Sequence, residues 1–479
     1  MRKHQKIGYR DLIDKFVGEI EAGVLIKGAS LPSSRDLAVD FGISRDTVVR
    51  CYRYLQDHAY ITSDGPRGSF VSYEHPSNPQ PDAAPPLDQS RLSNFGRLYL
   101  EERGLNLFLV DFPRLNYGAV PREYLPVKRW RELMQLHSKP NHFRSLNYET
   151  ETLGRSELRR AISSYLQRSK NLLTVPEQIA VFSISVGAVE LLCRLLLSEG
   201  DVIAVENPGF GGIKNIAAYR GLEVVPIDID REGLIVQDLD RLERTPKLIY
   251  VTPNSQDPSG IQMTLSRRTE LIEWCKKNRA WLIEDDFDGF YLHGKAQLPS
   301  LYSLDAAGNV IYISTFWQVL YPLTTTGFIL APQNLMAVIE KSKAHTHGIP
   351  ETMVQLTLAD MLDSGYLQKH VRLTGKTFGS RLRAFCYQAK RLLGEQISIN
   401  RQCAGLNCLI NLPAYPLELV LRAADAAELP LVSTQHFYSK KSHPTEYLVN
   451  FAAISEEQSK NALQKFVQIL RNNEKEPVR

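Results

Sequence analysis

Paired cysteines, long apolar runs and net charge are all scarce in this sequence of 479 residues. The six cysteines include no CxxC pair. The closest two, Cys403 and Cys408, lack the spacing of a zinc site, so we expect reduced packing residues and no metal site. No apolar stretch approaches the length of a membrane span, and the basic residues 1–6 lead into an amphipathic segment. We therefore expect a cytoplasmic protein without membrane contact.

The low net charge limits how the chain could meet a nucleic acid. A formal charge of +4 and an isoelectric point of about 8.6 do not mark a globally basic protein. Any DNA contact must therefore come from a local patch. Prolines and polar residues without helical or strand period dominate residues 75–92, which is typical of a linker. We predict a small module over 1–75, a linker over 76–104 and a large module over 105–479.

The small module has the pattern of several short helices. Its first segment places apolar residues at helical spacing and is closed by Gly23; these residues are Leu12, Ile13, Phe16, Val17 and Ile20. Two further helix starts follow, the first capped by Ser33 or Ser34 and the second by Ser44. Gly42 supplies the permissive backbone for a tight turn between them. This succession predicts a helix-turn-helix.

The second helix of this pair has an inner and an outer side. Val48, Tyr52 and Leu55 are predicted to face inward, which turns Arg45, Thr47 and Arg50 toward solvent near the helix N-terminus. A helix in this position can enter a major groove, where arginine reads guanine and the N-terminus favours phosphate. Residues 59–63 and 69–72 then alternate as two strands around a glycine-rich hairpin. That hairpin, a wing, would place Arg67 against the DNA backbone or minor groove.

The motifs L-P-S-S-R-x-L-A, G-I-S-R-x-T-V and Y-x-x-L run through the small module. Together they resemble the winged helix-turn-helix domain of GntR-type bacterial regulators. The resemblance implies that double-stranded DNA is the partner. It also implies that Arg35, Arg45 and Arg67 contact it, with Ser34, Thr47 and Gly68 bringing backbone close to phosphate. The alternative is an ordinary small domain whose arginines merely solvate its surface.

The large module alternates short apolar runs with helical patterns. The runs cover residues 178–182, 201–205, 248–251, 281–284 and 310–313. This alternation predicts a mostly parallel sheet buried on both faces, with ligands beyond the carboxyl ends of the strands. The residues after the runs are accordingly informative. Gly187 opens a helix whose amides suit phosphate, Phe210 can stack on a flat ring, and Asp257 and Asp285 follow the next two runs.

Residues 309–328 resemble the strand and loop that carry the Schiff-base lysine of fold-type I aminotransferases, written T-F-S-K-x-L-x-P-x-x-R-x-G-Y. By that resemblance Trp317 replaces the serine, Gln318 the lysine and Thr325 the arginine. A carboxamide cannot form an imine, because its nitrogen lone pair is delocalised into the carbonyl. We therefore expect that the chain is not an enzyme. The alternative that the Schiff-base lysine lies elsewhere, at Lys295, Lys341 or Lys343, stays open.

Other family positions are partly retained. Asp285 stands where an acid pairs with the pyridine nitrogen of pyridoxal phosphate. Phe287 lacks the hydroxyl of the usual tyrosine, Asp257 replaces an asparagine, and Leu448 replaces the arginine that often grips a substrate carboxylate. Trp317 and Thr325 remove phosphate ligands, and Trp317 is bulky enough to occupy part of that pocket. We expect no covalent pyridoxal phosphate, with non-covalent binding as the remaining possibility.

The two resemblances together point to the MocR/GabR subfamily of GntR-type regulators. They imply a multi-domain chain, with the winged helix followed by a fold-type I aminotransferase-like α/β domain. Its large part covers about 145–340, and a smaller C-terminal α/β part begins at about 341. They also imply a homodimer, with Tyr148 contributing across the interface, and an unknown small-molecule effector. The expected function is transcriptional regulation. The alternative is a pyridoxal-phosphate-dependent aminotransferase with an accessory DNA-binding arm.

Overall fold

A computed structural model describes residues 8–74, 89–92, 97, 120–140, 151–346, 351–400, 404–439 and 445–473. The chain divides into two compact units, 1–92 and 93–479, which we describe separately. Most of the predicted linker, Tyr148 and Cys403 lie outside the described residues. The predicted domain boundaries therefore stay predictions.

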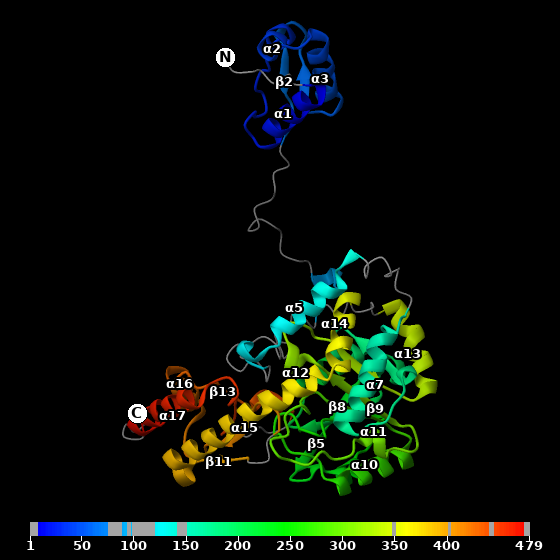
Figure 1. Cartoon of the computed structure of the whole chain (residues 1–479), viewed down its shortest axis with the longest axis vertical. Helices are drawn as coiled ribbons and strands as arrows, with labels where there is room; N and C mark the ends of the chain where they lie inside the picture. Colours follow the sequence, from blue (N-terminus) through cyan, green and yellow to red (C-terminus); the bar gives the residue numbers. More distant parts are fainter. Residues whose placement is uncertain are drawn as a thin grey trace. The chain divides into compact units, whose positions relative to one another are not determined.

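The described residues of the first unit form three α-helices and a two-stranded hairpin (Figure 1). The helices are α1 (Tyr9–Glu21), α2 (Ser34–Phe41) and α3 (Arg45–Asp57), and a 3-10 turn, η1 (Gly65–Arg67), joins β1 (Ile61–Ser63) to β2 (Ser69–Val71). β1 and β2 pair antiparallel. A short 3-10 helix, η3 (Gln89–Arg91), completes the described part of this unit.

Local capping explains where α2 and α3 begin and end. Ser33, not Ser34, caps α2, because its Oγ accepts from the Asp36 backbone N–H at 3.2 Å. Gly42 follows α2 in the left-handed region, with φ of 63°. Ser44 Oγ then accepts from the Thr47 N–H at 3.1 Å to start α3. The predicted tight turn between two capped helices is thus confirmed.

The core of the first unit lies where the three helices meet the hairpin. The predicted inward residues Val48 and Leu55 are fully buried, whereas Tyr52 is half-buried and donates its hydroxyl to the Pro32 carbonyl at 2.8 Å. Cys51 is also fully buried, and the sequence pattern did not single it out. Its small thiol behaves as a hydrophobic packing group, and burial raises its pKa to about 11.

The second unit is built on an eight-stranded sheet in the order β3-β10-β9-β8-β7-β4-β5-β6. The strands are β3 (Ile179–Phe182), β4 (Val202–Asn207), β5 (Glu223–Asp230), β6 (Gly233–Leu234), β7 (Leu248–Val251), β8 (Trp281–Asp286), β9 (Val310–Thr315) and β10 (Gly327–Leu330). Neighbours from β5 to β9 pair parallel, while β10 runs antiparallel to both β9 and β3. Strands occur at all five predicted runs.

Three strands of this sheet were missed: β6, which has only two residues, and the longer β5 and β10. β5 carries three acidic residues and exposes much of its surface near the sheet edge, so it lacks the apolar run of a buried strand. β10 is only four residues long and follows three threonines, which hides it within the loop. Both strands pair with buried neighbours, and these tertiary contacts stabilise them.

Helices cover both faces of the sheet. Side chains alternate, so that Ile283 of β8 joins the apolar cluster on one face and Leu282 the cluster on the other. The first cluster includes residues of α8 (Ser185–Leu196), α9 (Gly211–Tyr219) and α13 (Gln333–Thr346). The second includes residues of η7 (Val236–Arg241), α10 (Leu265–Asn278) and α11 (Leu301–Leu304). This arrangement confirms the predicted α/β layering.

A long helix leads from the sheet to a smaller C-terminal part (Figure 1). This is α15 (Tyr366–Leu393), and beyond it four antiparallel strands in the order β11-β12-β14-β13 pack with two helices. Their bounds are β11 (Ser398–Ile399), β12 (Cys408–Asn411), β13 (Leu431–Ser433), β14 (Glu446–Val449), α16 (Leu417–Ala426) and α17 (Glu456–Asn473), with η8 (Gly394–Gln396) and η9 (Gln435–Phe437) between them.

The remaining helices pack beside β3 and α15. α14 (Thr352–Asp363) contacts both α5 (Val127–His137) and α7 (Ser156–Lys170). The short elements η5 (Arg122–Tyr124), η6 (Pro176–Gln178) and α12 (Trp317–Leu320) complete the described set. One apolar cluster spans these helices, α15 and the C-terminal sheet, so the parts of this unit share a continuous core.

Arg268 on α10 holds the loop that follows β7. Its side chain is fully buried and donates to the carbonyl oxygens of Met263 at 3.1 Å and Pro253 at 2.9 Å. It also lies 3.8 Å from the buried carboxylate of Glu284. Arg268→Met should destabilise the second unit by about 3–5 kcal/mol, because it leaves Glu284 buried without its cation. Denaturant unfolding measures this loss.

Lys276→Met on the same helix is the matched control. The ammonium group of Lys276 is largely exposed, so the free energy of unfolding of this variant should stay within about 0.5 kcal/mol of that of the parent. Equal unfolding midpoints for the parent and the Arg268 variant would contradict the proposed role of the buried guanidinium.

Candidate functional site

A small cavity lies beside Gln318, where β9 gives way to α12. The Gln318 side chain is only 2% exposed, and its carboxamide oxygen has no hydrogen-bond partner among the described residues. The cavity volume is about 20 Å³. A space of this size admits roughly one water molecule, since about 10–15 Å³ is the least that one requires.

Four predicted pocket residues meet at this cavity, namely Asp257, Phe287, Trp317 and Gln318. Leu448 joins them from β14, so the C-terminal part closes one side. The other lining residues are Ser255, Gln256, Pro258, Gly260, Asp288, Ala404 and Asn407. No lysine or arginine among the described residues lines the cavity.

The wall after β7 is held by hydrogen bonds that sequence reasoning missed. Gln256 is buried and donates from Nε2 to the carbonyl oxygens of Pro208 and Asp257, each at 2.7 Å. Thr252 donates its N–H and its hydroxyl to Glu206 Oε2, at 3.0 and 2.7 Å. Burial raises the pKa of Glu206 to about 7 despite these donors. The only sequence signal for Gln256 was its position after a buried strand.

Asp285 lies at the end of β8 and does not line the small cavity. Its Oδ2 accepts from the Tyr250 hydroxyl, while its Oδ1 is buried without a partner among the described residues. Burial, helped by the nearby carboxylates Asp286 and Asp257, raises the pKa of Asp285 to about 7. The Tyr250 ring in turn stacks on Phe210, with centroids 6.2 Å apart.

Gly187 and Thr325 also lie away from the cavity lining. Thr325 donates its hydroxyl to the Ser183 carbonyl at 2.6 Å. Ser183 precedes α8, which contains Gly187 in its first turn. The eight predicted pocket residues therefore fall into a group around Gln318, a group around Tyr250 and a pair near the start of α8.

The three alternative lysines either donate hydrogen bonds to other groups or are exposed to solvent. Lys343 is fully buried on α13 and donates to the Thr152 carbonyl at 2.8 Å, and burial lowers its pKa to about 8. Lys295 donates to the Gly260 carbonyl at 3.1 Å from outside the cavity. Lys341 is exposed on α13. None of the three side chains lines the Gln318 cavity.

The predicted DNA-contacting arginines of the first unit, Arg35, Arg45, Arg50 and Arg67, are all exposed. Arg45 Nε donates to Ser34 Oγ at 3.3 Å, which ties the N-terminus of α3 to that of α2.

Local contacts restrain the other residues predicted at this surface. Arg50 lies over the Tyr9 ring at 4.9 Å, and Arg67 pairs with Asp64 at 3.4 Å. Thr47 shares a 2.8 Å hydrogen bond with Ser44, so its hydroxyl is part of the cap. Gly68 has φ of 105°, where a side chain would be strained.

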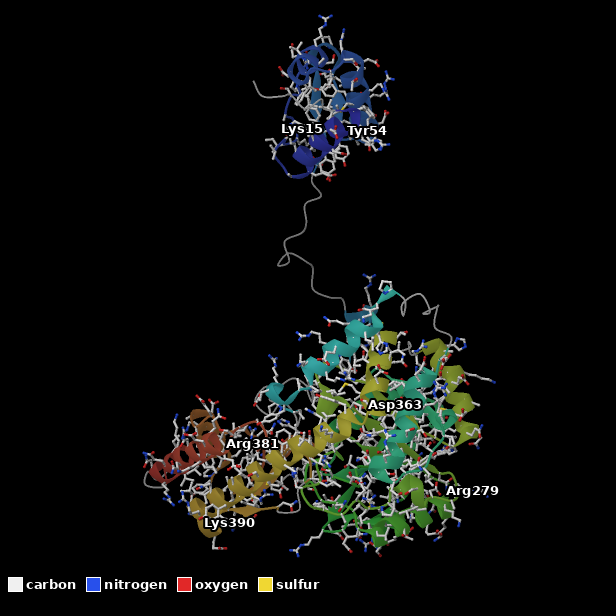
Figure 2. The ribbon with its side chains drawn as sticks, viewed as in Figure 1. Lys15, Tyr54, Arg279, Asp363, Arg381 and Lys390 are labelled. Atoms are coloured by element: carbon white, nitrogen blue, oxygen red, sulfur yellow. The ribbon has the colours of Figure 1, made fainter. Side chains whose placement is uncertain are left out.

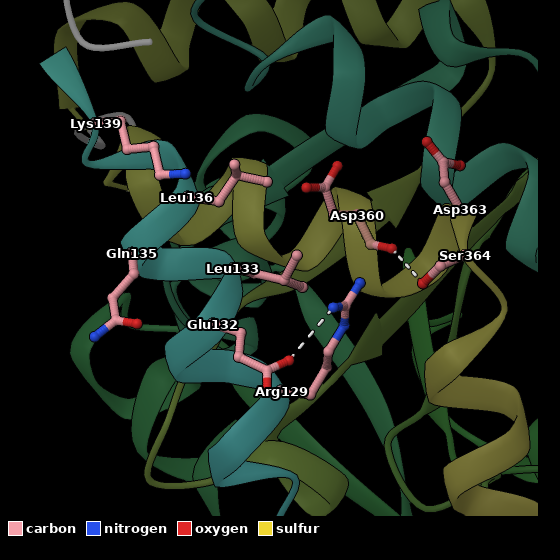
Figure 3. A pocket seen from close by; sticks show the side chains of 9 residues that line it. All are labelled: Arg129, Glu132, Leu133, Gln135, Leu136, Lys139, Asp360, Asp363 and Ser364. Atoms are coloured by element: carbon pink, nitrogen blue, oxygen red, sulfur yellow. Dashed lines mark hydrogen bonds and ion pairs between the residues drawn. The ribbon is translucent and has the colours of Figure 1, made fainter. Parts of the chain in front are cut away.

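A larger hollow of about 530 Å³ lies between α5 and α14 (Figure 3). Its charges are of both signs and partly paired: Arg129 lies 3.5 Å from Glu132, and Asp360 accepts from His137 at 3.0 Å. In the described part of the chain, no group of three or more His, Cys, Asp or Glu could hold a metal ion. No helix there is both long and apolar enough to cross a membrane.

The model of the aminotransferase class I and II family matches residues 115–466. The chain is 30% identical over 441 residues to the probable rhizopine catabolism regulatory protein MocR of Rhizobium meliloti, covering 90% of this chain and 87% of that one. It is 31% identical over 469 residues to YdeL, an uncharacterized HTH-type transcriptional regulator of Bacillus subtilis, covering 95% of each. The structure of the multiple substrate aminotransferase of Thermococcus profundus matches with a TM-score of 0.70 and 21% identity, over 81% of this chain and 98% of that one.

The second unit therefore contains a domain of the aminotransferase class I and II fold. The chain as a whole belongs to the MocR/GabR-type regulators, HTH-type proteins that carry such a domain. The likeness to the solved aminotransferase shows the fold alone.

The raised pKa of Asp285 predicts a pH-dependent stability. Between about pH 4 and 7 the folded chain keeps a proton that the unfolded carboxyl has lost, so stability falls as pH rises through this window. Asp285→Asn removes that penalty. We expect its thermal midpoint to exceed that of the parent by about 2 °C or more at pH 8, and the difference to shrink at pH 5.

Asp363→Asn, at an exposed carboxyl on α14, serves as the control for this comparison. Glu206 and Glu284 have pKa values raised to about 7 by burial, so some pH dependence should survive in the Asp285 variant. An unchanged slope of midpoint against pH in that variant would show that Asp285 is not one of the groups responsible.

Proposed function

We propose that this chain is a DNA-binding transcriptional regulator whose second unit recognises a small molecule without forming a covalent bond to pyridoxal phosphate. The observation that carries the proposal is the cavity at Gln318, which has a carboxamide where an amine is needed and no lysine among the described residues of its lining. A neutral amide cannot attack an aldehyde. The second unit can therefore bind but cannot start transamination.

The first unit supports the DNA-binding part of the proposal. Its α2, tight turn at Gly42 and α3 have the layout of a helix-turn-helix, and β1 and β2 have that of a wing. The α3 N-terminus carries the exposed Arg45, and the hairpin carries the exposed Arg67. These positions suit base contacts in the major groove and backbone contacts beside it. We therefore propose a GntR-type winged helix for this unit.

The residues present do not fit covalently held pyridoxal phosphate. The cavity beside Gln318 has room for about one water molecule, far less than the cofactor needs. Thr325 uses its hydroxyl on a backbone carbonyl, and Asp257 brings a carboxylate to the wall, where a phenolate would be repelled. Only the unpartnered Oδ1 of Asp285 matches what the pyridine nitrogen requires. Non-covalent binding would need the cavity to widen.

A second candidate function is an active pyridoxal-phosphate-dependent aminotransferase with an accessory DNA-binding arm. The class I and II match and the retained Asp285 favour it. The position of the lysines weighs against it, since Lys295, Lys341 and Lys343 all lie outside the cavity lining.

Two further parts of the proposal rest on the family resemblance. Fold-type I domains pair around a two-fold axis, and we propose the same for this chain. A symmetric dimer would read two half-sites whose spacing follows from the separation of its two arms. Analytical ultracentrifugation tests the dimer directly.

Arg45→Ala should weaken binding to the specific operator by about 1–3 kcal/mol, because it removes a base-reading guanidinium from the α3 N-terminus. Fluorescence anisotropy at several salt concentrations measures this loss on the full-length chain. Lys15→Ala removes the same charge from α1, where Lys15 pairs with Glu19, and should cost little. Equal losses in the two variants would indicate general electrostatics instead of base recognition.

The full-length protein is mixed with a substoichiometric amount of pyridoxal phosphate and then treated with borohydride. We expect every lysine to remain unmodified. Peptide mapping by mass spectrometry and the imine absorption band provide two independent readouts. A stoichiometric adduct on a single lysine would revive the aminotransferase function. That result would leave the DNA-binding proposal to be decided by the Arg45 experiment alone.

A further inference from the structure

A second, much larger cavity in the second unit shares no lining residue with the Gln318 cavity. It is formed by the end of α7, the segment 289–297 and one face of α15, and its volume is about 860 Å³. Volumes of about 300–1,000 Å³ are typical of small-molecule pockets. Neither Gln318 nor any of the predicted pocket residues lines it.

The charged residues that line this cavity are positive. The lining includes Lys170, Lys295, Arg372, Lys376 and Arg383, and no described aspartate or glutamate. Lys170 is neutralised by Asp286 at 3.0 Å, and Lys295 contacts a carbonyl. Within the described part of the chain, the other three cations form no ion pair. The hollow between α5 and α14 differs, because its cations and acids are interspersed.

Buried polar groups in the wall point to a ligand that hydrogen-bonds. Both the oxygen and the nitrogen of the Gln368 carboxamide are buried without a partner among the described residues. A buried polar group without a partner is destabilising, so a bound molecule that pairs with it would recover the lost hydrogen-bond energy. The ring of His293, another lining residue, is fixed, since its Nε2 lies 2.5 Å from the Gly405 carbonyl oxygen.

Two glycines of α15 give the cavity its depth. Gly375 and Gly379 lie on the lined face, inside a helix where glycine is less favourable than alanine. A Cβ at Gly375 would stand 3.4 Å from Tyr291 Cδ1, and one at Gly379 would stand 3.6 Å from His293 Nδ1. Both are ordinary contacts, so a larger side chain would enter the cavity without displacing the backbone.

We propose that this cavity binds a small anion that carries two or more phosphate or carboxylate groups. The three cations without an ion-pair partner supply the attraction, and the Gln368 carboxamide supplies a donor and an acceptor in the wall. The volume of about 860 Å³ and the aromatic residues Tyr165, Phe290 and Tyr291 in the lining favour a small molecule over a duplex. The site is separate from the Gln318 cavity, and binding there does not depend on the proposed function of the first unit.

The cavity continues at Arg383 into a neighbouring hollow of about 690 Å³ along α15. Lys390, labelled in Figure 2, and Arg391 add to the positive charge of that hollow. This extension makes nucleic acid the competing occupant that the experiment must distinguish.

Calorimetric titration of phosphate-free, full-length protein with inorganic pyrophosphate tests the proposal. We expect saturable binding that the double variant Arg372→Gln/Lys376→Gln weakens by about tenfold or more, equivalent to about 1.4 kcal/mol. Gly375→Leu keeps every charge but fills the cavity, so it should also abolish binding. The control Lys341→Gln/Lys369→Gln removes two exposed cations that line neither hollow, and it should bind as the parent does. Circular dichroism melts show whether each variant is folded.

Absence of saturation with the parent protein would overturn the proposal, as would pyrophosphate affinity that survives Gly375→Leu in a folded variant. An equal loss of affinity in the control pair would show that only general charge was acting. A third result would also contradict the proposal. In it, the parent binds no pyrophosphate, and the Arg372/Lys376 variant loses binding to a random-sequence DNA duplex. That outcome would assign this face to nucleic acid.

Discussion

Buried carboxylates at the carboxyl ends of the parallel strands impose the constraint on which the second unit depends. Glu206, Glu284, Asp285 and Asp286 all lie at strand ends with almost no exposure, and each must find a donor or a cation. Asp286 meets Lys170 and the Tyr312 hydroxyl, and these partners outweigh its burial and hold its pKa below the usual range. Glu206 accepts from Thr252 in the loop after β7, Glu284 lies close to Arg268 of α10, and Asp285 accepts from the Tyr250 hydroxyl of β7. These contacts fix the loops between sheet and helices, and therefore the walls of both cavities.

The same constraint explains why the two cavities differ. Beside Gln318 the loops close tightly, because Thr252 and Gln256 both donate to Glu206 Oε2 and leave little open space. On the α15 side, the lining contains no described acid, and its cation Lys170 forms an ion pair with Asp286. A chain that lacks an amine at the first site thus keeps a positively charged hollow at another. Recognition without covalent chemistry is compatible with both.

Sequence reasoning succeeded where short-range physics decides the structure. Caps at Ser33 and Ser44, the turn at Gly42 and five buried strands follow from local chemistry and apolar runs. It failed where contacts between residues far apart in the sequence determine the structure. β5 is stabilised mainly by its neighbour β4, and Gln256 is placed by contacts with the loop after β4, none of which leaves a local pattern. Nor could helical spacing show that Gln368 lies in a cavity wall with both polar atoms unpaired.

The sequence by itself determined the residue types on which chemistry depends: a carboxamide at 318, a carboxylate at 285 and arginines near the start of α3. These identities set what each group can donate, accept or attack, whatever surrounds it. Only the tertiary structure decided which of them share a space. It separated Asp285 and Thr325 from the Gln318 cavity and gathered cations from α7, α15 and the segment between β8 and α11 around another. Volume, burial and charge pairing arise from segments far apart in the chain, so no local pattern carries them.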